Sequence, residues 1–148
     1  MDSIFSASEP NLGYLFQIRY GLLLIISTLN PDSKLFIEKL DDISIETPNI
    51  LDVYQTKLHI NSVANLTDGS PDFWKTLRVW SEQIINKQIN PDNCFFNLIT
   101  TAPASTGSIP FLLKGETFDS RDIELIQTQL NHVIANSKST SNRSSYEA

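Results

Sequence analysis

An apolar run near the start of the chain restricts the folds open to it. Hydrophobic side chains crowd the segment from Leu12 to Leu29, at a spacing typical of a helix of about five turns that is largely buried around its circumference. Its longest uninterrupted part, Leu22 to Ile26, is far shorter than the roughly 20 residues that span a bilayer. A helix of this kind indicates a layered, folded domain and predicts no membrane segment.

After this helix the hydrophobic period changes to that of strands. Asn30-Pro31 ends the helix, and Asp41-Asp42 and Thr47-Pro48-Asn49 read as turns between strands. The predicted elements that follow the first helix are strands at 34–40, 43–46 and 51–60, a helix at 71–87, a strand at 94–101 and a helix through residues 123–134. Because the strand at 94–101 follows a helix, we expect a crossover that makes it a central strand. The order predicts an α/β fold, with a mixed sheet flanked by helices.

The length and the C-terminal composition predict one domain with a tail. A chain of 148 residues has the size of one ordinary domain, assigned here to residues 1–136. Residues 137–148 include five serines and no aliphatic residue larger than alanine. Such a stretch has little apolar surface to bury, so it is predicted to be a flexible Ser-rich tail or linker.

Charge and cysteine content exclude several classes of protein. The net charge of −6 provides no global basic field for nucleic acid, so any DNA contact must come from a local patch. The single cysteine, Cys94, cannot form an intramolecular disulfide and is predicted to be buried in its apolar strand. With only His59 and His132 besides, no zinc site is expected. No Lys or Arg precedes Arg19, which argues against a secretory signal and predicts a cytoplasmic protein.

One group of polar residues has the composition of a metal-nuclease site. Gln55 and Lys57 project to the same side of the third predicted strand, and the acidic turn containing Asp42 precedes them. Asp42, the Gln55 side-chain carbonyl and the Thr56 backbone carbonyl are oxygen ligands of the kind that Mg²⁺ prefers. Lys57 is then placed to orient an attacking water and to steady phosphate charge. The alternative is a solvent-facing strand beside an ordinary acidic turn.

Three segments of the chain resemble the PD-(D/E)xK nuclease superfamily. They are Gly13–Gln17 on the first helix, Phe36–Ile45 on the predicted hairpin and Tyr54–Lys57 on the third strand. The branch that the chain is most similar to is the double-stranded-DNA endonuclease domain of bacterial anti-phage (CBASS-type) effectors, a relative of Mrr-type enzymes with Gln in the last motif. The resemblance covers residues 11–101 and implies a restriction-endonuclease-like core.

The resemblance also implies roles for single residues. Asp42 corresponds to the metal-binding acid, Gln55 to the (D/E) position in its Gln form, Lys57 to the motif lysine and Gln17 to a helix glutamine beside the site. The implied activity is Mg²⁺- or Mn²⁺-dependent cleavage of double-stranded DNA, by a homo-oligomer or together with a sensor or ATPase partner. The alternative is a catalytically inactive nuclease-fold module that serves protein interaction or DNA recognition.

Four further residues are weaker candidates. Glu38 is either a second acid or a strand-end charge, and His59 is either a phosphate contact or a solvated strand end. Lys75 and Arg78 are either contacts to the DNA backbone or part of a solvated helix face.

Overall fold

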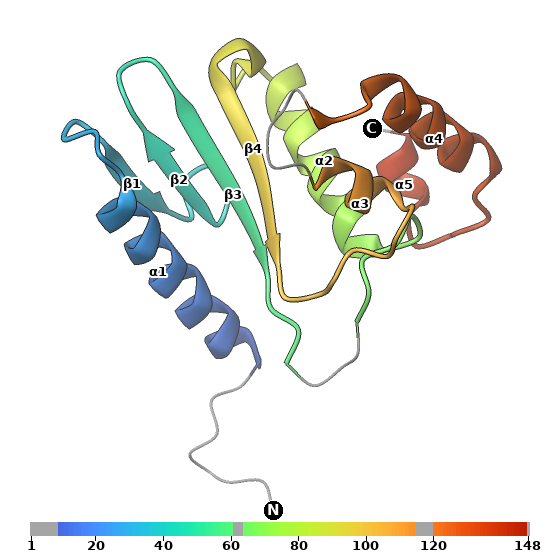
Figure 1. Cartoon of the computed structure of the whole chain (residues 1–148), viewed down its shortest axis with the longest axis horizontal. Helices are drawn as coiled ribbons and strands as arrows, with labels where there is room; N and C mark the ends of the chain where they lie inside the picture. The colour runs from blue at the N-terminus through green and yellow to red at the C-terminus, as the bar shows by residue number, and fades with distance from the viewer. Residues whose placement is uncertain (1–8, 61–63, 115–119, 148) are drawn as a thin grey trace, which may run out of the picture. The chain divides into compact units, whose positions relative to one another are not determined.

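The structure is a computed structural model that describes residues 9–60, 64–114 and 120–147. Its elements, in chain order, are α1 (Glu9–Ser27), β1 (Lys34–Ile37), β2 (Ile43–Glu46), β3 (Leu51–Lys57), α2 (Pro71–Ile85), η1 (Pro91–Asn93), β4 (Cys94–Thr100), α3 (Ile109–Leu113), α4 (Ile123–Asn136) and α5 (Arg143–Tyr146) (Figure 1). The chain divides into a first unit, residues 1–62 and 86–101, and a second unit, residues 63–85 and 102–148. Among the described helices, none is long and apolar enough to cross a membrane.

The first unit contains a four-stranded mixed sheet in the order β1-β2-β3-β4. β1, β2 and β3 pair antiparallel, and β4 pairs parallel to β3, with Leu51 opposite Cys94 and Lys57 opposite Thr100. The predicted α/β class, mixed sheet and crossover are therefore confirmed. The prediction that β4 is central is wrong, because β4 stands at an end of the strand order and its Phe95 is 57% exposed.

Helix α1 packs on one face of this sheet. A Cβ atom built on Gly21 would lie 3.2 Å from the Ile37 side chain, so glycine permits the close approach of the helix to β1. The Tyr20 ring lies 6.4 Å, centroid to centroid, from the Tyr54 ring on β3. Burial around the whole circumference is not observed, because side chains on the other side of α1, such as Ile26, stay exposed. The helix is thus apolar on two opposite sides, of which the sheet covers one.

The opposite face of the sheet carries a second layer of apolar contacts. Val53, which is fully buried, packs with Ile89 and Cys94, and Leu40 from the hairpin loop joins this cluster. Cys94 is buried, as predicted. Burial, and then the nearby Asp52 charge, raise the pKa of the Cys94 thiol to about 11. The thiol is therefore protonated at neutral pH and acts as a small apolar side chain.

Asp52 on β3 gives a pH-dependent prediction for stability. Burial raises the pKa of its carboxyl above the ordinary value, so the folded state holds this proton more tightly than the unfolded chain. The stability that the protonated Asp52 carboxyl gives the folded state is therefore fully present below the unfolded-state pKa. It is lost as pH rises through the folded-state pKa. We expect Asp52→Asn to raise the melting temperature at pH 7 and to leave it unchanged at pH 3. A melting temperature that falls at pH 7 would contradict this result.

The β1–β2 hairpin turns earlier than its sequence predicts. β1 ends at Ile37 because Glu38 adopts a left-handed φ of 57°, which no regular strand accommodates. The Glu38 amide then donates to the Asp42 carbonyl across the loop, at 3.0 Å. Lys39 folds back over the Phe36 ring, at 3.9 Å from its centroid, and pairs with Glu46. This loop brings Asp42 to the first position before β2.

The second unit is organised around the buried face of α2. The Trp74 indole donates to the Asp68 carbonyl at 2.6 Å, and the Asp68 carboxylate accepts from the Ile109 amide, which ties the loop before α2 to α3. Residues predicted as a flexible tail form α5 in this unit. Asn142 is 1% exposed and donates to the Gly69 carbonyl at 3.0 Å. The Tyr146 ring meets the Trp74 ring edge to face at 4.7 Å.

Candidate metal site at the end of the sheet

Asp42 and Thr56 are in direct contact where β2 begins and β3 ends. The Asp42 Oδ2 atom accepts hydrogen bonds from the Thr56 amide, at 2.7 Å, and from the Thr56 hydroxyl, at 2.6 Å. The backbone brings the two residues together because Ile43 pairs with Tyr54, so Asp42 lies one step further along the same ladder. Thr56 is 8% exposed, and the carboxylate satisfies polar groups that would otherwise be buried without partners.

The side chains of Gln55 and Lys57 project from the face of β3 that is opposite the face of Thr56. Successive side chains on a strand alternate between faces, so Gln55 and Lys57 share one face, while Tyr54 and Thr56 share the face that α1 covers. Asp42 contacts the Thr56 hydroxyl, which places its carboxylate toward the α1 side. Within the described part of the chain, no ion pair links Lys57 to Asp42. The structure thus joins Asp42 to Thr56 and leaves the Gln55 and Lys57 side chains on the opposite face.

Gln17 lies on the sheet-facing side of α1, at the same end of the sheet as Asp42. The hydroxyl groups of Thr28 and Ser33 are 3.3 Å apart, so α1 ends where β1 begins and the two elements run in opposite directions. Gln17 is four residues, about 6 Å along the helix axis, before Gly21, which itself lies over Ile37. That step runs toward the Ile37 end of β1, and Figure 1 shows α1 beginning near the end of β3.

The Gln17 side chain carries an unsatisfied oxygen. The residue is 9% exposed, and its Oε1 atom has no hydrogen-bond partner. A buried amide oxygen without a partner is unfavourable, and Asn142 Oδ1 in the second unit is another such atom. The position beside the site that the resemblance implied for Gln17 stays a prediction.

The donors at this end of the sheet fit a hard cation that keeps most of its water. The Asp42 carboxylate accepts its hydrogen bonds from Thr56 at Oδ2, and Gln17 Oε1 is a neutral amide oxygen without a hydrogen-bond partner. No group of three or more His, Cys, Asp or Glu side chains that could hold a metal occurs among the described residues. Mg²⁺ is commonly bound through one or two carboxylates plus waters and substrate phosphates, so one carboxylate and one amide suffice for such a site.

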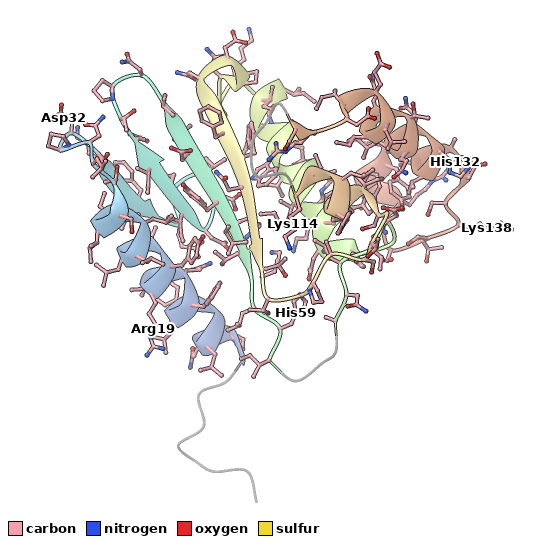
Figure 2. All side chains as sticks on the ribbon, viewed as in Figure 1. Arg19, Asp32, His59, Lys114, His132 and Lys138 are labelled. Atoms are coloured by element: carbon pink, nitrogen blue, oxygen red, sulfur yellow. The ribbon has the colours of Figure 1, made fainter. Side chains whose placement is uncertain are left out.

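Glu38 and His59 have local structural contacts. Glu38 is exposed and occupies the turn of the β1–β2 hairpin. The His59 amide donates to the Thr101 hydroxyl at 2.8 Å, and the same hydroxyl donates to the His59 carbonyl at 3.2 Å. Figure 2 shows His59 directly after β3, beside the end of β4. Thr101, the last residue of the predicted strand at 94–101, thus links the ends of β3 and β4 through these two hydrogen bonds.

Lys75 and Arg78 belong to α2 and hence to the second unit. Lys75 is exposed. Arg78 Nε lies 3.6 Å from Glu82 Oε1, and its Nη1 atom donates to the Ser144 hydroxyl at 3.4 Å. Arg78 is therefore engaged within its own unit, and the DNA contact of both residues stays a prediction.

A groove of about 480 Å³ lies at the other end of the β1–β2 pair. It contains none of the candidate site residues. Its lining consists of Pro31, Asp32, Ser33, Lys34, Glu46, Thr47 and Pro48, and Figure 2 labels Asp32 there.

Comparison with known proteins identifies no relative of this chain. No family model matches it, no curated protein matches it and no solved structure matches it.

Proposed function

We propose that this chain is a metal-dependent endonuclease domain of the restriction-endonuclease-like type, which cleaves double-stranded DNA in anti-phage defence. The order α1, β1-β2-β3 antiparallel, crossover and parallel β4 supports this proposal, because it matches the core that the sequence resemblance implies. The observation that carries the proposal is the end of the sheet at Asp42. There Thr56 orients the Asp42 carboxylate, and α1, which packs on the same face of the sheet, carries the buried amide oxygen of Gln17 that has no hydrogen-bond partner.

The candidate site residues have different roles in this mechanism. Asp42 and Gln17 hold Mg²⁺ or Mn²⁺, which supplies Lewis-acid chemistry at a phosphate when bound. Lys57 is the last residue of β3, so its backbone lies at the same end of the sheet as Asp42. Because its side chain starts on the face opposite Thr56, the flexible four-carbon stem must extend past the end of the sheet for the ammonium to steady the developing phosphate charge and orient the attacking water. Gln55 and Thr56 are the remaining candidate ligands from the sequence.

A second candidate is a catalytically inactive module with the same fold, which serves DNA recognition or protein interaction. One observation favours it. Asp42 Oδ2 is satisfied by two hydrogen bonds from Thr56, while Gln55 and Lys57 leave from the opposite face of β3. In this version Asp42 extends the ladder between β2 and β3, and catalysis is not required to explain its position.

Incubation of the purified chain with supercoiled plasmid DNA separates the two candidates. The endonuclease proposal predicts nicked and linear products with Mg²⁺ or Mn²⁺ and none with EDTA. Cleavage that persists in EDTA would rule out the metal-dependent mechanism. A chain that binds DNA in a mobility-shift assay but is inert with both metals would support the inactive module, provided that Mg²⁺ and Mn²⁺ titrations by calorimetry detect no bound cation.

A further inference from the structure

The outward side of α1 carries a continuous stripe of exposed aliphatic side chains. This side is opposite Tyr20 and Gly21, which contact the sheet. Figure 2 shows Arg19 projecting from α1 away from the strands. The stripe residues, with their exposed fractions, are Leu15 (44%), Ile18 (39%), Leu22 (54%) and Ile26 (71%) on α1, and Leu29 (99%) two residues past the end of the helix. Exposed apolar patches of this kind mark interaction sites more often than scattered single residues do.

The order of residues in the stripe is the same when it is read in either direction. Leu22 is central, Ile18 and Ile26 flank it four residues away on each side, and Leu15 and Leu29 flank it seven residues away on each side. The spacing keeps Leu15, Ile18, Leu22 and Ile26 on one side of α1, and Leu29 follows two residues after the helix ends at Ser27. A surface of this type is self-complementary under a two-fold axis through Leu22, which is the condition for an isologous interface between identical chains.

We propose that the α1 stripe is the interface with a second copy of this chain, formed by antiparallel pairing of the two α1 helices. In this arrangement Leu22 meets the partner's Leu22, and Leu15 meets the partner's Leu29. Ile18 meets the partner's Ile26. Each copy then buries aliphatic side chains that its own sheet leaves exposed.

The charges near the stripe agree with a second copy as the occupant. None of the stripe residues is acidic, although the whole chain has a net charge of −6, and Arg19 is the one charged residue between Pro10 and Pro31. The negative charges that repel each other in two copies therefore lie mainly on other surfaces, and salt screens their repulsion. A lipid surface is a poorer occupant, because helices that bind membranes carry several Lys or Arg beside their apolar face.

The inference stands apart from the proposed nuclease activity. A dimer supplies two copies of the Asp42 site, which suits the cleavage of two DNA strands. Dimerisation itself does not need an active site, so a dimer without nuclease activity, or an active monomer, shows which of the two proposals has failed.

The oligomeric state of the full chain tests the interface. Analytical ultracentrifugation over a concentration series is expected to show a dimer. Leu22→Glu and Ile26→Glu each place carboxylates against apolar or like-charged partners across the axis, so we expect dimerisation to weaken by at least about 100-fold. The matched control is Ile85→Glu on α2, since Ile85 is 67% exposed and lies outside the stripe. Circular dichroism confirms that each variant is folded.

Cysteine cross-linking tests the antiparallel geometry. Because the native Cys94 is buried, introduced cysteines report on the surface alone. Mild oxidation is expected to cross-link Leu22→Cys to itself, and Leu15→Cys to Leu29→Cys in a mixture of the two variants. Leu23→Cys, at a position 57% exposed beside the stripe, is the control and is expected to stay uncross-linked. A monomer at all concentrations, or a dimer that Leu22→Glu and Ile85→Glu affect equally, would overturn the proposal.

Discussion

Replacing Lys57 with alanine is expected to slow metal-dependent plasmid cleavage by about 10²–10³-fold while the chain stays folded. The magnitude is that of removing one positioned electrostatic group from a transition state. The structure places Lys57 at the end of β3 with a half-buried side chain, outside the apolar clusters of the sheet, so its loss has little effect on folding. Initial rates of plasmid nicking, together with urea unfolding, measure the two effects separately.

The control for this variant is Lys34→Ala. Lys34 is exposed at the start of β1, at the end of the sheet away from Asp42, so its removal is expected to leave the rate unchanged. If Lys57→Ala cleaves as fast as the native chain, the role proposed for Lys57 is excluded. Equal loss in both variants would indicate a general effect of charge on DNA binding.

Asp42 requires a different comparison, because it supports the fold as well as the proposed site. Its carboxylate accepts two hydrogen bonds from Thr56, and hydrogen bonds to charged groups contribute about 1.5–3 kcal/mol each. Asp42→Asn removes the negative charge but retains an acceptor oxygen for Thr56. Asp42→Ala removes both the charge and the hydrogen-bond partner of Thr56. Cleavage is expected to fall in both variants, and the free energy of unfolding is expected to fall mainly in Asp42→Ala.

Gln55→Glu identifies the face of β3 that meets the cation. A carboxylate in the coordination shell would tighten Mg²⁺ binding, which calorimetry measures. Unchanged affinity would agree with the structure, in which Gln55 leaves from the face opposite Asp42's contact with Thr56.

The strands were predictable from sequence because their signals are local. Alternation in β2 and β3 and the turn residues between them located both strands, and the helix before Cys94 indicated the parallel pairing of β4. The early end of β1 was not predictable, because it results from a left-handed backbone at Glu38, a residue type that gives no such signal. The contact between Asp42 and Thr56 was only partly predicted: both residues were chosen as ligands, but through the Thr56 carbonyl and not its hydroxyl.

The burial of α1 and the position of the C-terminal residues could not be predicted from composition. A helix that is apolar on both sides, such as α1, is predicted to be buried on both sides. Its sequence does not reveal that the sheet buries only one of them. In the C-terminal segment the serines indicated flexibility, whereas the contacts that hold it depend on Asn142 and Tyr146. A single buried amide and a single ring have no hydrophobic period, so pattern analysis does not detect them.

Removal of residues 138–148 is therefore expected to destabilise the second unit. The truncation deletes the hydrogen bond from Asn142 to the Gly69 carbonyl and the edge-to-face contact of Tyr146 with Trp74. A neutral hydrogen bond contributes about 0.5–1.5 kcal/mol and an aromatic pair about 0.5–1.5 kcal/mol beyond its buried area, so a loss of roughly 2–4 kcal/mol is expected once Trp74 is uncovered.

Tryptophan fluorescence during urea unfolding measures this loss in the relevant unit, because the chain's two tryptophans, Trp74 and Trp80, both lie on α2. Tyr146→Ala is expected to reproduce about half of the effect, and Lys138→Ala, at an exposed position in the same segment, is expected to have none. An unchanged unfolding midpoint after truncation would show that the segment is dispensable, as its composition alone suggests. A lowered midpoint that Tyr146→Ala shares would show instead that one aromatic side chain is enough to order a serine-rich segment, because the packing of Tyr146 against Trp74 offsets the backbone entropy lost by its polar neighbours.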